Sequence, residues 1–196
     1  MKKYFLTIFL LLPLAGFASR QIPDIIIYND TEYHTLSFVL EAYFAAYPER
    51  RPEVQQTITS LNRGYIATYE IVNNELILID LKSDVNEDFT GSQFISIFNN
   101  YFEAGAKITI SGTIAIINGE SAGVHVGFNP IYQSYIILEV VNGDVVSSHI
   151  VNSYQYLQLL IEEAAGYNDW QNYLITVLDK LIERNNLLEL AGNFGE

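Results

Sequence analysis

Residues Arg63–Lys82 read RGYIATYEIVNNELILIDLK, the stretch of the chain that most clearly indicates a β-hairpin. β-Branched and aromatic residues fill both halves, and Asn73-Asn74 lies between them. Asparagine tolerates the positive φ of a two-residue hairpin loop, so the pattern predicts antiparallel strands at 65–71 and 76–82. Counting outward from the loop predicts four cross-strand pairs: Ile71–Leu76, Tyr69–Leu78, Ala67–Asp80 and Tyr65–Lys82.

Side chains alternate between the two faces of a strand, so one face of this hairpin is predicted to mix aromatic and charged residues. They are Arg63, Tyr65, Ala67, Tyr69, Leu78, Asp80 and Lys82. Two interpretations follow. The face is a sheet surface on which Arg63 pairs with Asp80 or Asp84, or it is an aromatic-lined recess whose guanidinium binds an anionic or sugar-like ligand.

The start of the chain is typical of a secretory signal peptide. Two lysines precede the apolar run Tyr4–Ala15, and Gly16-Phe17-Ala18 ends small-x-small. We therefore expect a signal peptide at 1–18, cleavage after Ala18 or Ser19, and one globular domain at 19–196 in the periplasm or secreted space; the alternative is an uncleaved signal anchor. No other apolar run approaches the length of a membrane span.

Composition narrows the choice of partners. The net charge is −13, and cleavage would remove two of the lysines. Such a surface repels nucleic acid and anionic lipid, so neither is an expected partner. The chain has no cysteine, so its core must stabilise it without disulfides, and the usual attachment residue of an exported lipoprotein is missing.

Hydrophobic periodicity and turn signals predict an α+β fold: a curved, mainly antiparallel sheet of roughly eight strands, short inserted helices and two C-terminal helices. Turns are predicted at Asn29-Asp30, Asn118-Gly119 and Asn142-Gly143. The predicted strands are 24–28, 33–38, 65–71, 76–82, 107–117, 124–128, 133–141 and 144–151. The predicted helices are 39–47, 93–102, 152–165 and 168–192. The core is expected to include Ile136, Leu138, Val140, Leu157, Leu160, Ile161, Ala164, Trp170, Leu174, Val177, Leu178 and Leu181.

One motif matches a serine nucleophile. Gly119-Glu120-Ser121-Ala122-Gly123 has the spacing of an esterase elbow, and Asp144 and His149 follow in the matching order. That motif requires a strand, a sharp turn and then a helix, whereas Val124-His125-Val126 alternates like a strand. We therefore interpret the motif as a turn rather than a catalytic triad.

Metal binding is not expected. Asp84, Asn86 and Asp88 have the alternate spacing of a calcium loop, but Phe89 and Ile95 stand where an EF-hand needs glycine and glutamate. An irregular calcium site or a solvated loop are the alternatives. No two histidines have zinc-ligand spacing, and no cofactor is predicted.

His125 lies within a predicted strand, close in sequence to Tyr132 and Tyr135. It is interpreted either as a hydrogen-bonded structural residue or as part of a ligand recess. Carboxylates also interrupt apolar runs at Glu41, Glu70 and Glu139, where they either face solvent or supply an acid–base pair.

Two segments carry a resemblance. Arg63-Gly64-Tyr65-Ile66-Ala67-Thr68-Tyr69 and Val124-His125-Val126-Gly127-Phe128, followed by Tyr132, resemble motifs of a family of uncharacterised exported or soluble bacterial proteins. The similarity extends over about residues 24–150 and leaves out the C-terminal helices. The resemblance implies no established activity, but it singles out Arg63, Tyr65 and His125.

Together these observations predict an exported binding protein whose candidate ligand-binding residues are Arg63, Tyr65, Tyr69, Asp80, His125 and Tyr132. The partner would be a small molecule or an envelope protein. Two alternatives stay open. One is a hydrolase that uses carboxylates or His125. The other is a structural or partner-binding envelope protein with an exposed apolar patch on the C-terminal helices.

Overall fold

The computed structural model describes residues 20–54, 58–85 and 93–192, with side chains up to residue 186. The predicted signal peptide lies outside these ranges, and so do Asn86 and Asp88 of the calcium-like loop.

The predicted α+β class is confirmed. Within the described residues, nine strands form a mixed, mostly antiparallel sheet: β1 (Asp24–Tyr28), β2 (Thr31–Thr35), β3 (Ile66–Val72), β4 (Glu75–Asp84), β5 (Phe94–Ser96), β6 (Ala106–Lys107), β7 (Gly112–Val126), β8 (Asn129–Val141) and β9 (Asp144–Asn152). The helices are α1 (Val39–Ala46), the 3₁₀ turn η1 (Pro48–Arg50), α2 (Phe98–Tyr101), α3 (Ser153–Glu163) and α4 (Asn168–Gly192).

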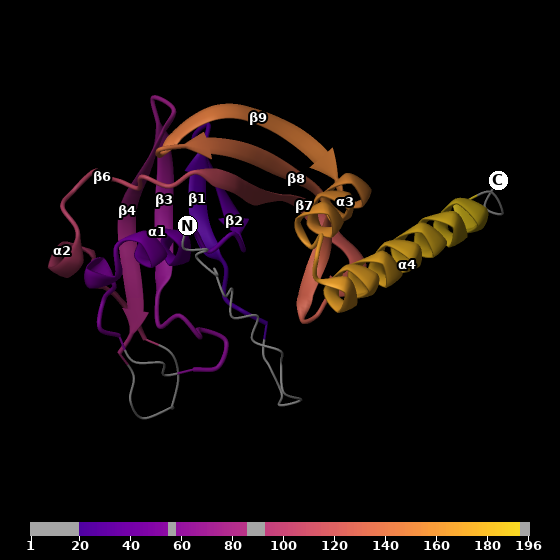
Figure 1. The fold of residues 1–196 in the computed structure, drawn as a ribbon, viewed down its shortest axis with the longest axis horizontal. Coiled ribbons are helices and arrows are strands. Elements are labelled where there is room, and N and C mark those ends of the chain that lie inside the picture. The colour runs from indigo at the N-terminus through magenta and orange to yellow at the C-terminus, as the bar shows by residue number, and fades with distance from the viewer. Residues whose placement is uncertain (1–19, 55–57, 86–92, 193–196) are drawn as a thin grey trace, which may run out of the picture.

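The strand order is β3-β1-β2-β7-β8-β9-β4-β5, and β3 also pairs with β4, so the order closes on itself. Two junctions in this ring are narrow. β2 meets β7 at the single pair Thr35–Ile116, and β4 meets β9 at the single pair Glu75–Asp144. Figure 1 shows the result: β1–β4 lie side by side, while β7–β9 arch away from them towards α3 and α4.

The β4–β9 junction is held by charge and by a close backbone approach. The Lys107 ammonium lies 2.8 Å from Glu75 Oε1 and 2.7 Å from Asp144 Oδ1. Next to it, Gly143 has a φ of +82°, and a Cβ there would lie 2.6 Å from the carbonyl oxygen of Ile108. Glycine is required for both reasons, because a side chain would be strained and would clash with the backbone.

The predicted β3–β4 hairpin is confirmed, but two of its four predicted cross-strand pairs are wrong. Asn73 and Asn74 have φ values of +51° and +66°, and the Ile71–Leu76 and Tyr69–Leu78 pairs form as predicted. A bulge then leaves Ile79 unpaired, so that Asp80 lies opposite Thr68 and Lys82 opposite Ile66. An extra residue in one strand shifts every later side chain to the other face.

The bulge changes what each face of the hairpin carries. Leu81 joins Tyr65, Ala67, Tyr69 and Leu78 as a fully buried core residue. Asp80 and Lys82 move to the opposite face. The predicted aromatic-and-charged face is therefore divided, and its aromatic half points into the protein interior.

Of the three other predicted tight turns, two are confirmed and one prediction is wrong. Positive φ values occur at Asn29-Asp30 and at Asn142-Gly143, as predicted. At Asn118-Gly119, however, β7 continues to Val126 with two irregularities in its pairing with β8. The positive φ of Gly119 is accommodated as a bulge, and the chain turns instead at 127–128.

Several predicted elements have different boundaries. The strand predicted at 124–128 is the end of β7, and the one predicted at 133–141 begins at Asn129. The second strand ends at Thr35 rather than at 38. Residues 93–102 form β5 and the short α2 instead of one helix, because β5 pairs with the last three residues of β4. The strand predicted at 107–117 is interrupted at 108–111, where backbone groups of Ile108 and Ile110 bond to Leu76 and Gly143.

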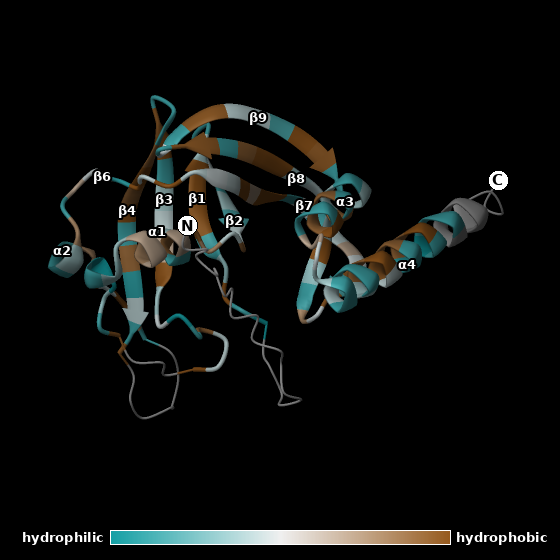
Figure 2. Ribbon diagram, viewed as in Figure 1, coloured by the Kyte–Doolittle hydropathy of each residue, from teal (hydrophilic) through white to brown (hydrophobic). Residues whose placement is uncertain are grey.

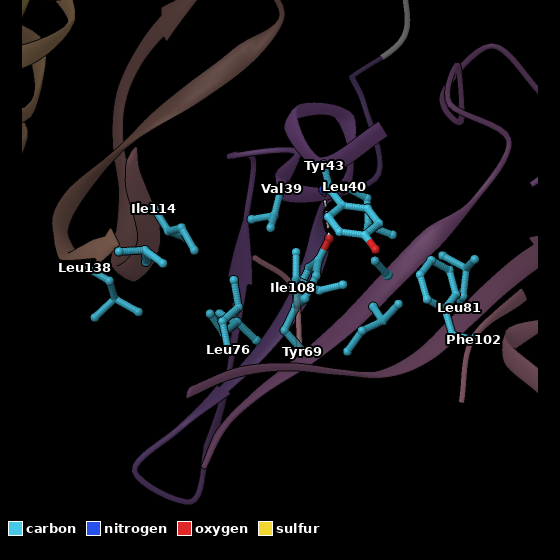
Figure 3. Close-up of a cluster of buried hydrophobic side chains, with 14 of the residues drawn as sticks. Val39, Leu40, Tyr43, Tyr69, Leu76, Leu81, Phe102, Ile108, Ile114 and Leu138 are labelled. Atoms are coloured by element: carbon cyan, nitrogen blue, oxygen red, sulfur yellow. Dashed lines mark hydrogen bonds between the residues drawn. The ribbon is translucent and has the colours of Figure 1, made fainter. Parts of the chain in front are cut away.

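Most of the core lies between β1–β4, α1 and the inner face of the β7–β8 arch. Figure 3 shows Leu40 and Tyr43 of α1 above Tyr69, with Ile114 and Leu138 approaching from the arch. β8 is buried on both sides: Ile136, Leu138 and Val140 face this core as predicted, while Tyr135 and Ile137 face α3. Figure 2 shows the corresponding hydrophobic stretches along β1, β4 and β8.

The two C-terminal helices pack on the far end of the arch. Asn152 and Gln155 form a reciprocal capping box at the start of α3. Leu157, Ala164, Leu174, Val177 and Leu181 form a second core with Val124 and Ile131. Trp170 was expected in this core but is 39 % exposed.

Candidate functional site

Arg63 forms a buried ion pair with Asp24, not with Asp80 or Asp84 as predicted. Its Nη2 donates to Asp24 Oδ1 at 3.1 Å and to the carbonyl of Ile22 at 3.0 Å. The Phe38 ring covers the guanidinium, with its centroid 3.9 Å from Cζ. Arg63 is thereby enclosed, and only 8 % of its side chain is exposed.

The environment of Asp24 disfavours its charge. Burial raises the pKa of this carboxyl to about 6, although Arg63 and the Ala67 amide both lower it. Asp24 Oδ1 accepts from the Ala67 amide at 3.0 Å as well as from Arg63. The pair therefore joins β1, the segment before β3 and, through the Ala67 amide, β3 itself.

Tyr65, which directly precedes β3, and Tyr69 within β3 are fully buried and connect this part of the chain to α1. The Tyr65 hydroxyl donates to Glu41 Oε1 at 2.7 Å, and the Tyr69 hydroxyl accepts from the Leu40 amide at 3.2 Å. Burial raises the pKa of both phenols well above the usual range. Arg63, Tyr65 and Tyr69 thus converge, as the sequence suggested, but in a closed network rather than in an open recess.

The other three candidates lie elsewhere. Asp80 accepts from Ser96 Oγ at 2.6 Å and pairs with Lys82 at 3.5 Å, on the opposite face of β4 from Tyr69. His125 is exposed opposite Pro130, near the β7–β8 turn. The Tyr132 hydroxyl accepts from the Arg20 guanidinium.

Arg63 and His125 therefore belong to different parts of the molecule. Arg63 is bonded to β1 and to the segment before it. The neighbours of His125, Val124 and Val126, pack into the second core beside α4. Arg63 and His125 do not share a site.

A groove between separate segments is a stronger candidate. Two adjoining cavities of about 210 Å³ and about 320 Å³ share the lining residues Leu36, Ser37, Ala115, Tyr156 and Leu160. The walls come from the loop after β2, the outer face of β7–β8, α3 and the start of α4. We call this feature the Ser37–Tyr156 groove.

Local structure explains why these side chains meet. Thr35 Oγ1 donates to the carbonyl of Ala115 at 2.8 Å, and the Ala115 amide donates to Ser37 Oγ at 2.9 Å. These bonds fix the loop after β2 against β7. On α3, Tyr156, Leu160 and Glu163 are spaced at i, i+4 and i+7, which places them on one face of the helix.

The centre of the groove is aromatic. The Tyr135 and Tyr156 rings are stacked with centroids 3.8 Å apart, and the Tyr135 hydroxyl accepts from the Tyr132 amide at 2.9 Å. Burial, followed by the charge of Glu163, raises the pKa of Tyr156 to about 12. Burial also raises the pKa of Tyr135, so both phenols are neutral near pH 7. Tyr156 lines the larger cavity together with the Glu163 carboxylate.

The two ends of the groove differ. Trp170 and Asn129 line only the smaller cavity, and Glu163 and Thr113 line only the larger one. Among the described residues, Asn129 Oδ1 is buried without a hydrogen-bond partner. Glu163 is exposed, and it forms no ion pair or hydrogen bond within the described part of the chain. One end is thus mainly apolar, while the other carries a free carboxylate.

Sequence reasoning missed this groove. Leu160 was assigned to a helical core stripe, Trp170 to the core, and 36–38 to a strand. Tyr135 was noted only as a neighbour of His125. The available signal was the tyrosine, leucine and glutamate stripe on α3, which is not purely apolar.

Within residues 20–54, 58–85 and 93–192, no cluster of three or more His, Cys, Asp or Glu side chains could hold a metal ion. No helix in those ranges is long and apolar enough to cross a membrane.

Comparison with other proteins adds no assignment: no protein-family model matches the chain, and neither the curated proteins nor the solved structures yield a match. The resemblance drawn from the Arg63 and His125 segments therefore stays a prediction.

Proposed function

We propose that this chain is an exported binding protein that holds a small, ring-bearing molecule in the Ser37–Tyr156 groove. One observation carries the proposal: the groove has the Tyr135–Tyr156 stack in its wall and Trp170 at one end. Aromatic walls offer large, rigid contact area to a planar or sugar-like ring. Ligand sites are typically such concave, mainly apolar surfaces with a few polar groups.

The size of the groove supports a small ligand. Its two cavities, at about 210 Å³ and about 320 Å³, are near the lower end of the range for ligand pockets. A molecule with one or two rings fits that space. The hydrogen bonds from Thr35 and Ala115 hold the Ser37 wall in place, so the site is preformed and little ordering cost opposes binding.

The groove chemistry supports binding rather than hydrolysis. A glycosidase-like mechanism typically needs two carboxylates at the same bond, and general acid–base catalysis most often uses a histidine. Among the described residues that line the groove, Glu163 is the one carboxylate, and there is no histidine. The hydrolase alternative would need another site.

Export is part of the proposal and rests on the sequence alone. The lysine pair, the apolar run Tyr4–Ala15 and the small-x-small ending have the three parts of a cleavable leader. Mass spectrometry of the protein recovered from its native host would test this. A mature chain that begins at Ser19 or Arg20 is expected, and a chain that retains residues 1–18 would contradict export by cleavage.

Binding can be measured through the protein's own fluorescence, because Trp170 is the single tryptophan of the chain. A panel of phenyl, indole-free heteroaromatic and sugar probes would be titrated while tryptophan is excited selectively. Saturable change in Trp170 emission is the expected result for at least one probe class, since a bound ring displaces water from the indole.

A matched pair of variants locates the effect. Trp170→Ala removes a groove residue that is 39 % exposed, and Tyr154→Ala removes an α3 ring that is 40 % exposed and does not line the groove. Calorimetry should show weaker probe binding in Trp170→Ala and unchanged binding in Tyr154→Ala. Equal losses in both, or no binding by the wild type, would contradict the proposal.

A further inference from the structure

We infer that the molecule held in the Ser37–Tyr156 groove is a cation, with an apolar or aromatic ring and an ammonium group joined by a short linker. This inference rests on the proposed function and specifies its ligand class. The ring would occupy the smaller cavity at Trp170, and the ammonium would occupy the larger cavity at Glu163.

The charge of the residues that line the groove favours a cationic ligand. In the described part of the chain, the residues that line the two cavities include no lysine, arginine or histidine, and Glu163 is the one charged group among them. An anionic ligand would therefore meet no counter-charge, whereas an ammonium would meet a carboxylate. The net charge of −13 acts in the same direction, since it raises the local concentration of cations near the surface.

The position of Glu163 suits it to pair with the ammonium group of the ligand. It ends α3, it lies on the same helical face as Tyr156 and Leu160, and it has no ion-pair partner within the described residues. Glu163 and Tyr156 both line the larger cavity, and they lie on the same face of α3. An ammonium beside Glu163 would thus also lie near the Tyr156 ring.

The aromatic side chains of the groove also favour a cation. Tyrosine and tryptophan faces attract cations through the ring quadrupole, and the attraction is larger where water is excluded. Tyr156 lines both cavities and is the ring beside the predicted ammonium, whereas Tyr135 and Trp170 line only the smaller cavity, where the ligand ring would lie. A site for a carboxylate or phosphate would instead be expected to present guanidinium groups or backbone amides. The nearby Arg20 guanidinium already contacts the Tyr132 hydroxyl, and neither residue lines the groove.

Three probes with one ring and different charges test the inference: phenethylamine, phenethyl alcohol and phenylacetate. Trp170 emission reports the affinity of each. We expect the amine to bind roughly 3- to 30-fold more tightly than the alcohol, from the combined cation–π and ion-pair contributions. Phenylacetate should bind more weakly than the alcohol, and added salt should reduce the advantage of the amine.

Two neighbouring glutamates on α3 supply a matched control. Glu163→Gln removes the groove carboxylate, and Glu162→Gln removes the same charge from an adjacent exposed position outside the lining. Glu163→Gln should weaken phenethylamine roughly 2- to 5-fold and leave phenethyl alcohol unchanged. Glu162→Gln should leave both affinities unchanged.

The outcomes separate the inference from the function on which it rests. If phenethyl alcohol binds in the groove and the amine binds no more tightly, the ammonium assignment is overturned and the binding function stands. If both glutamate variants weaken the amine equally, general surface charge explains the preference, and the assignment to Glu163 fails. If the sugar probes bind but none of the phenyl probes does, the cationic ligand class is wrong. If no probe of the wider panel binds, the proposed function fails as well.

Discussion

The Arg63 guanidinium lies 3.1 Å from the carboxylate of Asp24, a residue with no exposed surface, and the two are 39 positions apart in the chain. The Asp24 side chain is fully buried and the Arg63 side chain is almost fully buried, so each charge depends on the other for compensation. This pair joins the start of β1 to the segment before β3, and we assign it a structural role.

Arg63→Ala should lower the free energy of unfolding by about 3–5 kcal/mol, because it leaves the Asp24 carboxylate buried without a counter-charge. Arg51→Ala is a suitable control, since Arg51 pairs with Glu41 at the surface and its loss should cost at most about 1 kcal/mol. Urea denaturation near neutral pH would measure both. Similar losses in the two variants would contradict the structural role of the buried pair.

Asp24 should make stability depend on pH in an unusual direction. Its pKa is raised from 3.8 to about 6, so the folded state holds a proton that the unfolded state has released between these values. The contribution of this group to stability is therefore full below pH 3.8 and is lost as the pH rises through about 6, with a total near 3 kcal/mol.

Comparison with Asp24→Asn would isolate that contribution. The wild-type free energy of unfolding, minus that of the variant, should decrease across this pH window. A constant difference would show that Asp24 has an ordinary pKa in the folded protein.

The hydroxyls of Tyr65 and Tyr69 should differ in their contribution to stability. Tyr69→Phe leaves the buried Leu40 amide, at the start of α1, without its acceptor and should cost about 1–3 kcal/mol. Tyr65→Phe should cost about 1 kcal/mol, because Glu41 still pairs with Arg51 at the surface. Thermal unfolding would rank the two variants.

Neither phenylalanine variant should alter ligand binding, since both rings are enclosed in the core. Probe titrations of the folded variants would check this. A selective loss of affinity in Tyr65→Phe would instead favour a ligand site at the Arg63 network.

The capping box of α3 should affect both stability and the groove. Asn152→Ala removes the acceptor of the Gln155 amide and should cost about 0.5–2 kcal/mol. Fraying of the first turn would loosen Tyr156, one turn further along, and weaken probe binding. Asn185→Ala, at an exposed position within α4, should change stability by less than about 0.5 kcal/mol. Unchanged stability in Asn152→Ala would contradict the importance of the cap.

The sequence identified the features that depend on local geometry. Positive φ is a property of a single residue, so Asn29-Asp30, Asn73-Asn74 and Asn142-Gly143 were all recognisable as turns. The apolar stripes of α3 and α4 were recognisable for the same reason, since helical periodicity is local.

Features that depend on distant partners could not be predicted in this way. The bulge at Ile79 places Leu81 on the core side, and nothing within the hairpin sequence requires it. Asn118-Gly119 has the composition of a turn, yet β8 pairs with both sides of it and holds it within a strand. In each case tertiary packing outweighed local preference.

The candidate site shows the same limit. The convergence of Arg63, Tyr65 and Tyr69 was predicted, but their burial follows from α1 and Phe38, which cover them. The groove brings Ser37, Ala115 and Leu160 together from three segments that are far apart in the chain. One sequence contains no signal for that proximity.

The most direct test of the central claim is a ¹H–¹⁵N NMR titration of residues 19–196 with phenethyl alcohol, which carries a ring and no charge. We predict saturable shifts at the amides of Ser37, Ala115 and Leu160, and at the indole N–H of Trp170, with Arg63 and Tyr65 unaffected. Shifts centred on Arg63 and Tyr65, with the groove residues unchanged, would contradict it.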